Sequence, residues 1–217
     1  KVLFLVHREQ IAKQALHSYR RVFGKSKTFG LLSGNQRELD KDFIFSTMQM
    51  MAKEEIRTQF NKEEFDVIII DEFSMVDVPL MAELLRRIDL DKTRMILVGD
   101  HNQLPPVGAG NVLRDCIKHK LVPTFILDEV VRQAGVLKTN SMAILSQRVM
   151  PTAVGDPAWS VIDTLKDLMQ IQVYLRDLVL NRIPDRLGLD PVNDVQIITP
   201  THLGPLGTKT INEMMQY

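Results

Sequence analysis

The stretch that decides the fold is Phe65-Asp66-Val67-Ile68-Ile69-Ile70-Asp71-Glu72. Its four consecutive β-branched residues are typical of a strand that is buried on both faces of a parallel sheet. Two acids follow at once, so they should lie at the carboxyl end of the strand, where α/β proteins bind their ligands. The same acids would also suit a plain turn or the cap of the next helix.

Similar short apolar runs recur on both sides of this strand, and segments with helical spacing separate many of them. We expect further strands at residues 2–6, 43–46, 95–98, 125–127 and 195–198. Helical spacing marks residues 11–23 and 78–88, and a longer helix is expected over 159–183, ended by Pro184 and the 188–191 stretch. This alternation predicts an α/β fold in which helices cover both faces of a parallel sheet.

The composition restricts the function classes. The 217 residues contain 27 Lys and Arg against 27 Asp and Glu, so nucleic acid would have to be held by local clusters and not by overall charge. A single cysteine excludes an internal disulfide and indicates a reducing compartment, which favours the cytoplasm. The sequence contains no apolar stretch of the roughly 18 residues that a membrane span needs, so we expect no membrane partner. It opens directly as a strand, and we expect it to begin inside a larger protein.

The acidic pair suits the hydrolysis of a nucleoside triphosphate. That reaction needs one acid to hold Mg²⁺, for which Asp71 is placed, and a second to polarise the attacking water, which suits Glu72. The next predicted strand runs into Gly99-Asp100-His101-Asn102-Gln103-Leu104-Pro105-Pro106-Val107-Gly108-Ala109-Gly110, with a helix starting near Asn111. Glycines there allow close approach to a ligand, and Gln103 can sense a phosphate oxygen. An ordinary strand–loop–helix joint would also explain this loop.

From Glu72 onward the chain resembles RecD-like DNA helicases of superfamily 1B. The resemblance rests on Asp71–Asp77, the 99–110 loop, the 127–133 stretch LDEVVRQ and the 198–208 stretch ITPTHLGPLGT, which occur in RecD-like order. It implies two RecA-like domains with ATP and Mg²⁺ in the cleft between them. It also implies that Gln103 reads the γ-phosphate, that Arg132 crosses from the second domain to stabilise the transition state, and that Gly99, Asp100 and Gln133 bind the nucleotide. Thr199, Thr201 and His202 would contact DNA.

The first third resembles superfamily 2 helicases of the DEAD/DEAH type. The resemblance rests on LFLVHREQI at residues 3–11, GLLSGN at 30–35 and FSTMQ at 45–49. In that family these segments line the nucleic-acid track, which implies that His7, Arg8, Ser46, Thr47 and Gln49 contact a single strand. Each of these residues would also suit a helix cap or a turn. Two families would then meet near Asp71-Glu72, in an engineered chimera or a natural hybrid.

A phosphate-binding loop of the form GxxxxGK[ST] does not occur in these 217 residues. Gly24-Lys25-Ser26 supplies the last three letters, but Tyr19 stands where the first glycine belongs, and a predicted helix precedes it in place of a strand. We interpret Gly24 as the end of that helix. In both families the loop lies upstream of the strand at residues 2–6.

The sequence therefore predicts part of an ATP-dependent DNA helicase, inactive by itself, with partner subunits as a further expectation. Residues 1–126 would form a first RecA-like domain without its phosphate-loop strand, and residues 127–217 a linker, helices and the start of a second. Two alternatives stay open. One is a catalytically dead RecA-like scaffold that binds nucleic acid or proteins; the other, a nucleotide kinase, leaves Arg132 and Gln133 unexplained.

Overall fold

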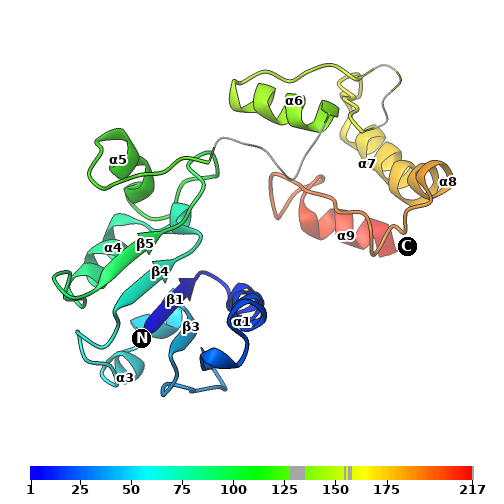
Figure 1. Ribbon diagram of the computed structural model, residues 1–217. Helices are drawn as coiled ribbons and strands as arrows, with labels where there is room; N and C mark the ends of the chain where they lie inside the picture. Colours follow the sequence, from blue (N-terminus) through cyan, green and yellow to red (C-terminus); the bar gives the residue numbers. More distant parts are fainter. Residues whose placement is uncertain (128–134, 154, 156–157, 217) are drawn as a thin grey trace. The chain divides into compact units, whose positions relative to one another are not determined.

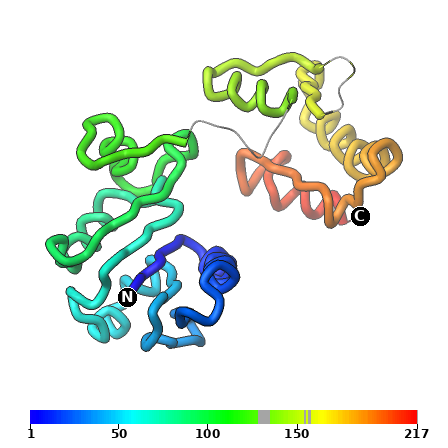
Figure 2. Tube along the Cα trace, in the orientation of Figure 1, coloured from blue at the N-terminus to red at the C-terminus, as the bar shows by residue number. Residues whose placement is uncertain are grey.

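The computed structural model describes residues 1–127, 135–153, 155 and 158–216. The chain forms two compact units, Lys1–Asp128 and Glu129–Tyr217. The first runs from blue to green in Figures 1 and 2, and the second from green to red. Each unit has its own architecture.

The first unit is built on a parallel sheet. Its described residues form five strands: β1 (Val2–Val6), β2 (Phe29–Leu32), β3 (Phe43–Thr47), β4 (Val67–Ile70) and β5 (Arg94–Leu97). Their order in the sheet is β2-β3-β1-β4-β5, and every neighbouring pair is parallel. With the helices around it, this sheet forms the RecA-like α/β fold that the sequence predicted (Figure 1). All five carboxyl ends therefore lie at one edge of the sheet.

One face of the sheet is covered by α1 (Glu9–Phe23). The helix buries Ala12 and Leu16 against Phe4 and Val6 of β1, with aromatic rings from β2 and β3 completing this cluster. Gly24 ends α1 with a φ of 58°, a conformation that a side chain disfavours, and so confirms its expected role as a helix stop. The 3₁₀ turn η1 (Gly24–Ser26) follows.

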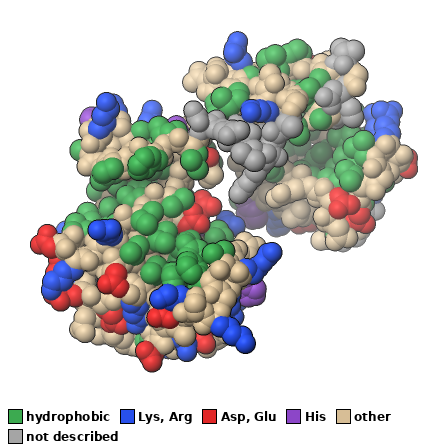
Figure 3. Space-filling model, in the orientation of Figure 1, with side chains coloured by type: hydrophobic (Ala, Val, Ile, Leu, Met, Phe, Trp, Pro, Cys, Tyr) green, Lys and Arg blue, Asp and Glu red, His purple; other side chains and the backbone are tan. Residues whose placement is uncertain are grey.

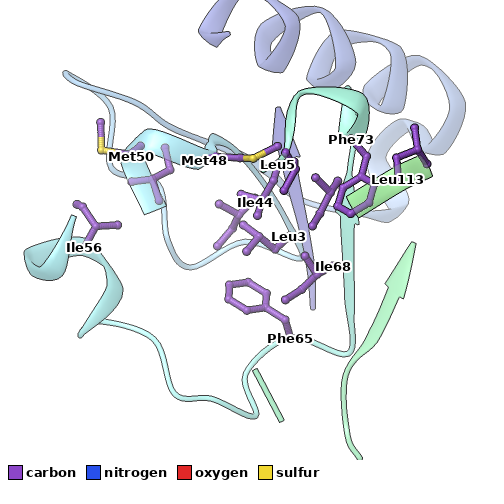
Figure 4. Packing of buried hydrophobic residues seen from close by; sticks show 13 residues of the cluster. Leu3, Leu5, Ile44, Met48, Met50, Ile56, Phe65, Ile68, Phe73 and Leu113 are labelled. Carbon is purple, nitrogen blue, oxygen red and sulfur yellow. The ribbon is translucent and has the colours of Figure 1, made fainter. Parts of the chain in front are cut away.

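The opposite face is covered by four shorter helices: α2 (Met48–Ala52), α3 (Glu54–Arg57), α4 (Val78–Leu85) and α5 (Val112–Lys118). Alternate residues of β1 point to this side, so Leu3 and Leu5 join a second core with Ile68, Phe73 and Leu113 (Figure 4). The two faces thus share the strands, which explains why the apolar runs are continuous and not alternating.

In the second unit, the described residues form helices and no strand. These helices are α6 (Gly135–Leu145), α7 (Leu168–Asp177), the π-helix η3 (Leu178–Arg182), α8 (Ile183–Leu187) and α9 (Thr208–Gln216). Gln172 of α7 donates a hydrogen bond of 2.6 Å to the Pro205 carbonyl, which ties α7 to the segment before α9. Across the parts of the chain that the structure describes, no helix has the length and apolar character needed to cross a membrane.

Of the two predicted stops of the long helix, Pro184 is wrong and the stretch that starts at Gly188 is confirmed. The helix begins at Leu168, later than expected, continues through Pro184 and stops at Gly188, which has a φ of 67°. Proline lacks an N–H and its ring crowds the carbonyl four residues earlier. That carbonyl belongs to Leu180, which lies within the wider π turn of η3, so the turn reduces the crowding.

Two predicted strands are also wrong, and one real strand was missed. Residues 125–127 and 195–198 are extended or irregular without a partner strand in the described chain, and Phe125 and Ile198 are 93% and 86% exposed. The missed strand β2 contains Gly30, where an added Cβ would overlap the Glu38 carbonyl oxygen. This glycine lets the 34–41 segment pack onto the strand, but it weakens the strand signal in the sequence.

Strand β5 forms one border of the sheet. It pairs with β4 on one side only, and Ile96 and Val98 keep 49% and 47% of their surface exposed. The face of the first unit that is visible in Figure 3 carries a patch of hydrophobic side chains among charges of both signs. This border lies next to the loop at residues 99–110, which belongs to the candidate site.

Candidate functional site

The candidate site lies at the carboxyl edge of the sheet, and Asp71 occupies its centre. Asp71 directly follows β4, and its amide donates a 2.9 Å hydrogen bond to the Leu5 carbonyl of β1. Its carboxylate accepts a 3.0 Å hydrogen bond from the Glu72 amide, and both residues are half-buried. The acidic pair therefore lies where the parallel-sheet argument put it.

Glu72 adopts an unusual backbone conformation. Its φ of 56° and ψ of 37° are left-handed, a region that non-glycine residues rarely occupy and that costs of the order of 1–3 kcal/mol. The strain is held by neighbours on both sides, because the 3₁₀ turn η2 (Phe73–Met75) starts here and the Phe73 amide donates 2.8 Å to the Val98 carbonyl. Strain of this kind concentrates at functional positions, which makes Glu72 a candidate for chemistry.

The 99–110 loop is packed against the residues that follow Glu72. A Cβ at Gly99 would lie 2.9 Å from the Ser74 amide nitrogen, and one at Gly108 would overlap Asp77 Oδ2. The Val78 amide donates 3.0 Å to the Ala109 carbonyl, while Asp77 Oδ1 accepts from the Leu80 amide at 2.8 Å and caps α4. These contacts join the loop after β4 to the loop after β5, as a shared site requires.

Two functional candidates in this joint were missed by sequence reasoning. Asp77 was assigned only to a motif, although it both caps α4 and contacts Gly108. Ser74 is 4% exposed, and its Oγ has no hydrogen-bond partner among the described residues. A buried hydroxyl without a partner is costly, which makes Ser74 a candidate for a role at the joint. A single serine carries no periodicity or spacing that could have indicated this.

The close approach at Gly99 gives a test of this packing. We expect Gly99→Ala to lower the free energy of unfolding by about 1–3 kcal/mol, because the new methyl group meets backbone and Leu113 at 2.9–3.0 Å. Gly34→Ala is the matched control, since nothing lies within 4 Å of its Cβ position. Urea unfolding of both variants measures the difference, and equal stabilities would show that the loop is not packed at Gly99.

Asp100 and Gln103 lie together at the tip of the loop. Asp100 Oδ1 accepts a 2.9 Å hydrogen bond from the Asn102 amide, and its Oδ2 accepts a weaker one of 3.4 Å from Gln103 Nε2. Both side chains are exposed, so they are free to meet a ligand. The turn holds Gln103 at the same edge of the sheet as Asp71, because β4 and β5 end together, with Ile70 opposite Leu97.

The residues expected in the nucleic-acid track also follow strands at this edge. Gln49 Nε2 and His7 Nδ1 are 3.2 Å apart and link the ends of β3 and β1. Arg8 is exposed at the start of α1, and Thr47 Oγ1 caps α2 by accepting from the Met50 amide at 3.2 Å. The expectation that Ser46 contacts nucleic acid directly is wrong. It is fully buried, and its hydroxyl donates to the Leu32 carbonyl at 3.0 Å.

The remaining site residues belong to the second unit or lie outside the described residues. Thr199, Thr201 and His202 form a loop before α9, in which His202 Nδ1 lies 2.8 Å from Thr208 Oγ1. Both threonine hydroxyls donate to backbone carbonyls two residues ahead, at 2.9 Å. Arg132 and Gln133 lie outside the described residues, so their predicted roles stay predictions.

Asp71 has an electrostatic effect on a residue outside the acidic pair. Burial raises the pKa of Tyr19 on α1, and the charge of Asp71 raises it further. Among the described residues, no group of three His, Cys, Asp or Glu side chains could hold a metal ion. The donor set nevertheless suits Mg²⁺, which is usually held by one or two carboxylates together with the phosphates of a substrate. Gly24-Lys25-Ser26 lies at the end of α1, toward the opposite edge of the sheet.

Residues 13–173 match the AAA domain family. Over 152 residues the chain is 33% identical to the ATP-dependent RecD2 DNA helicase of Deinococcus radiodurans. The matched segment covers 70% of this chain and 20% of that protein. Over 67 residues it is 40% identical to the RecBCD enzyme subunit RecD of Buchnera aphidicola, and this match covers 31% of this chain and 11% of that protein. Over 76 residues it is 45% identical to an uncharacterised protein of Methanocaldococcus jannaschii, which covers 35% and 6%.

These matches support the resemblance to RecD-like helicases, but they cover only a small part of each relative. The chain spans between 6% and 20% of the length of these three relatives. The family match runs without a break through Asp71-Glu72, where we expected two helicase families to meet. The comparisons give no support to such a junction, or to a chimera.

Proposed function

The chain belongs to the AAA domain family, and from that premise we propose that it is part of an ATP-hydrolysing motor that moves along single-stranded DNA. The observation that carries this proposal is the carboxyl edge of the first sheet. Asp71 and Glu72 lie there beside the Gly99–Gly110 loop, and His7, Arg8 and Gln49 follow the neighbouring strands. At such an edge, the acidic pair and the Gly99–Gly110 loop would bind a nucleotide, and the residues after the neighbouring strands would contact the phosphates of a nucleic acid.

In the nucleotide half of the site, each residue has one role. Asp71 would hold Mg²⁺ through its water shell, and the ion would neutralise charge on the phosphates of ATP. Glu72 would accept a proton from the attacking water. Gln103 would contact the γ-phosphate from the tip of its loop, and the backbone at Gly99 and Asp100 would approach the nucleotide. Arg132 and Gln133 would complete the site.

In the nucleic-acid half, exposed polar groups would contact phosphates without reading sequence. The side chains of Arg8 and Gln49 are exposed where they follow β1 and β3. His7 forms a hydrogen bond with Gln49. The Thr47 hydroxyl already caps α2, so it would contribute by holding the first turn of that helix. Thr199, Thr201 and His202 would add contacts from the second unit.

The domain organisation and partners are part of the same proposal. Residues 1–126 would form a first RecA-like domain, and residues 127–217 would lead into a second, from which Arg132 reaches the nucleotide. Two relatives, the RecD proteins of Buchnera, are by name subunits of a RecBCD enzyme. We therefore include partner subunits in the proposal for the protein that contains this chain.

The test of the proposal is the ATPase activity of the longer protein that contains this chain, measured with and without single-stranded DNA. We expect hydrolysis that requires Mg²⁺ and is stimulated by DNA. DNA binding with no hydrolysis under any condition would instead support the catalytically dead scaffold.

The track makes a separate prediction about salt. Replacing Arg8 by alanine should reduce the dependence of log K on log salt concentration for single-stranded DNA by about 0.7, because one phosphate contact is lost. Arg21→Ala is the matched control, since Arg21 is exposed in the last turn of the same helix, away from the edge. Anisotropy titrations at several salt concentrations measure both slopes. Equal slopes for the two variants would remove Arg8 from the track.

A further inference from the structure

A cavity of about 50 Å³ lies in the first unit, apart from the groups that the proposed reaction uses. Its floor is formed by Leu5 and Ile70, at the carboxyl ends of β1 and β4. Its walls come from two helices on that face of the sheet: Met48 and Met51 from α2, and Leu80 and Leu84 from α4. Leu5 and Met48 lie side by side in the close view of this core (Figure 4).

The size and lining of the cavity favour an apolar occupant. A single water needs only about 10–15 Å³ of such volume, but it also needs two to four polar partners. The floor and walls offer methyl and methylene groups, so water gains little there. An apolar cavity of about 150 Å³ holds the six carbons of a benzene ring, so this cavity, with about one third of that volume, has room for about two carbons.

Charged side chains stand at the solvent-facing side of the cavity. Arg57 of α3 and Glu83 of α4 form an ion pair of 3.7 Å, and Arg87 donates to Glu83 through Nε at 2.6 Å. These three lining side chains keep 22%, 40% and 37% of their surface exposed, so they reach solvent.

The charges at this side do not balance. Glu83 is shared among Arg57, Arg86 and Arg87, and the only other acid among their ion pairs in the described chain is Glu54, 3.8 Å from Arg57. Hydrogen bonding from Arg87 holds the pKa of Glu83 below its ordinary value, so Glu83 is ionised at neutral pH. Of the residues that line the cavity, Arg57 and Arg87 are positive and Glu83 alone is negative, which leaves one positive charge in excess.

We propose that this cavity is a binding site for a small carboxylate with an apolar tail of about two carbons. The tail occupies the space between α2 and α4, and the carboxylate pairs with Arg57 and Arg87, which balances the excess charge. A neutral molecule of the same shape lacks that pairing, and a nucleotide is too large and too polar for the lining. The site is separate from the proposed ATP and DNA contacts, so its occupation does not depend on the proposed function.

The probe for this site is propanoate, with propan-1-ol as its neutral counterpart. The protein is labelled with ¹³C in its methionine methyl groups and titrated with each compound by NMR. We expect propanoate to shift the Met48 and Met51 resonances saturably, with a dissociation constant on the order of a millimolar, as its small size allows. Met75, which is 41% exposed and does not line the cavity, should not shift.

Two variants separate the tail from the charge. Ala52→Leu places a branched side chain in the cavity from α2 and should abolish the shifts, while Arg87→Gln should weaken the carboxylate about tenfold or more and leave the alcohol unchanged. A native methionine spectrum from each variant shows that it is folded. The proposal is overturned if the carboxylate and the alcohol bind equally well, if Ala52→Leu binds as tightly as the parent, or if Met48 and Met51 do not respond.

Discussion

In the Glu72→Gln variant, we expect ATP hydrolysis to fall by about 10²–10⁴-fold while the affinity for ATP stays close to that of the parent protein. The amide keeps the shape of the carboxylate but cannot accept a proton from water. Because the acid that would hold Mg²⁺ is Asp71, the nucleotide should still bind. A loss of turnover without a loss of binding is the signature of a general base.

The structure adds a reason to expect a large effect at Glu72. Its backbone stays in the left-handed region at φ 56°, although glutamate gains nothing from this conformation. The hydrogen bond from Phe73 to Val98 and the packing of Gly99 against Ser74 hold the turn in place. The position is therefore fixed by neighbours on two strands, so the side chain starts from one backbone direction and little rearrangement precedes the reaction.

A matched control lies at the other end of the same strand. Glu63 precedes β4, is exposed and pairs with Lys92 at 2.6 Å, so Glu63→Gln should change neither turnover nor affinity. Steady-state hydrolysis and equilibrium nucleotide binding are measured on both variants. Turnover of Glu72→Gln within a few-fold of the parent would remove Glu72 from the mechanism.

The strands near the acidic pair could be predicted because their own residues determine them. Val67–Ile70 and Val2–Val6 are apolar and branched enough to be buried on both faces, and the structure has both with the predicted bounds. Since parallel strands share a carboxyl edge, the meeting of Asp71, Gly99 and Gln49 at one edge followed from the fold. The fold thus accounts for the positions of these residues, while their roles, which came from residue chemistry and the family resemblances, stay predictions.

The wrong predictions concern residues whose structure depends on contacts with residues distant in the sequence. Residues 195–198 are apolar enough for a strand, but a strand needs a neighbour, and none pairs with it in the described chain. Gly30 argues against a strand until the approach of Glu38 is known. Ser46 was predicted to contact nucleic acid because the sequence does not show its hydrogen bond to the Leu32 carbonyl on the neighbouring strand. The Asp77–Gly108 contact was missed for the same reason.

The largest loss of rate is expected from Arg132→Ala, in which hydrolysis should fall by about 10³–10⁵-fold. The prediction rests on the RecD-like stretch LDEVVRQ at residues 127–133 and on the proposed function. A guanidinium group that meets the γ-phosphate gains most when negative charge spreads over the transferring oxygens, so its removal affects the transition state more than the bound ATP. Nucleotide affinity should therefore fall far less than turnover.

A lysine at this position separates charge from geometry. Arg132→Lys keeps the positive charge but offers a single point donor in place of a planar fork, so it should recover only a small part of the lost rate. Arg148→Ala is the control for removing an arginine from the second unit, because Arg148 is exposed in the turn after α6 and should leave turnover unchanged. Single-turnover hydrolysis and ATP binding on all three variants give the comparison. If Arg132→Ala lowered affinity and turnover by the same factor, Arg132 would bind ATP and the transition state equally, and its proposed role in stabilising the transition state would be wrong.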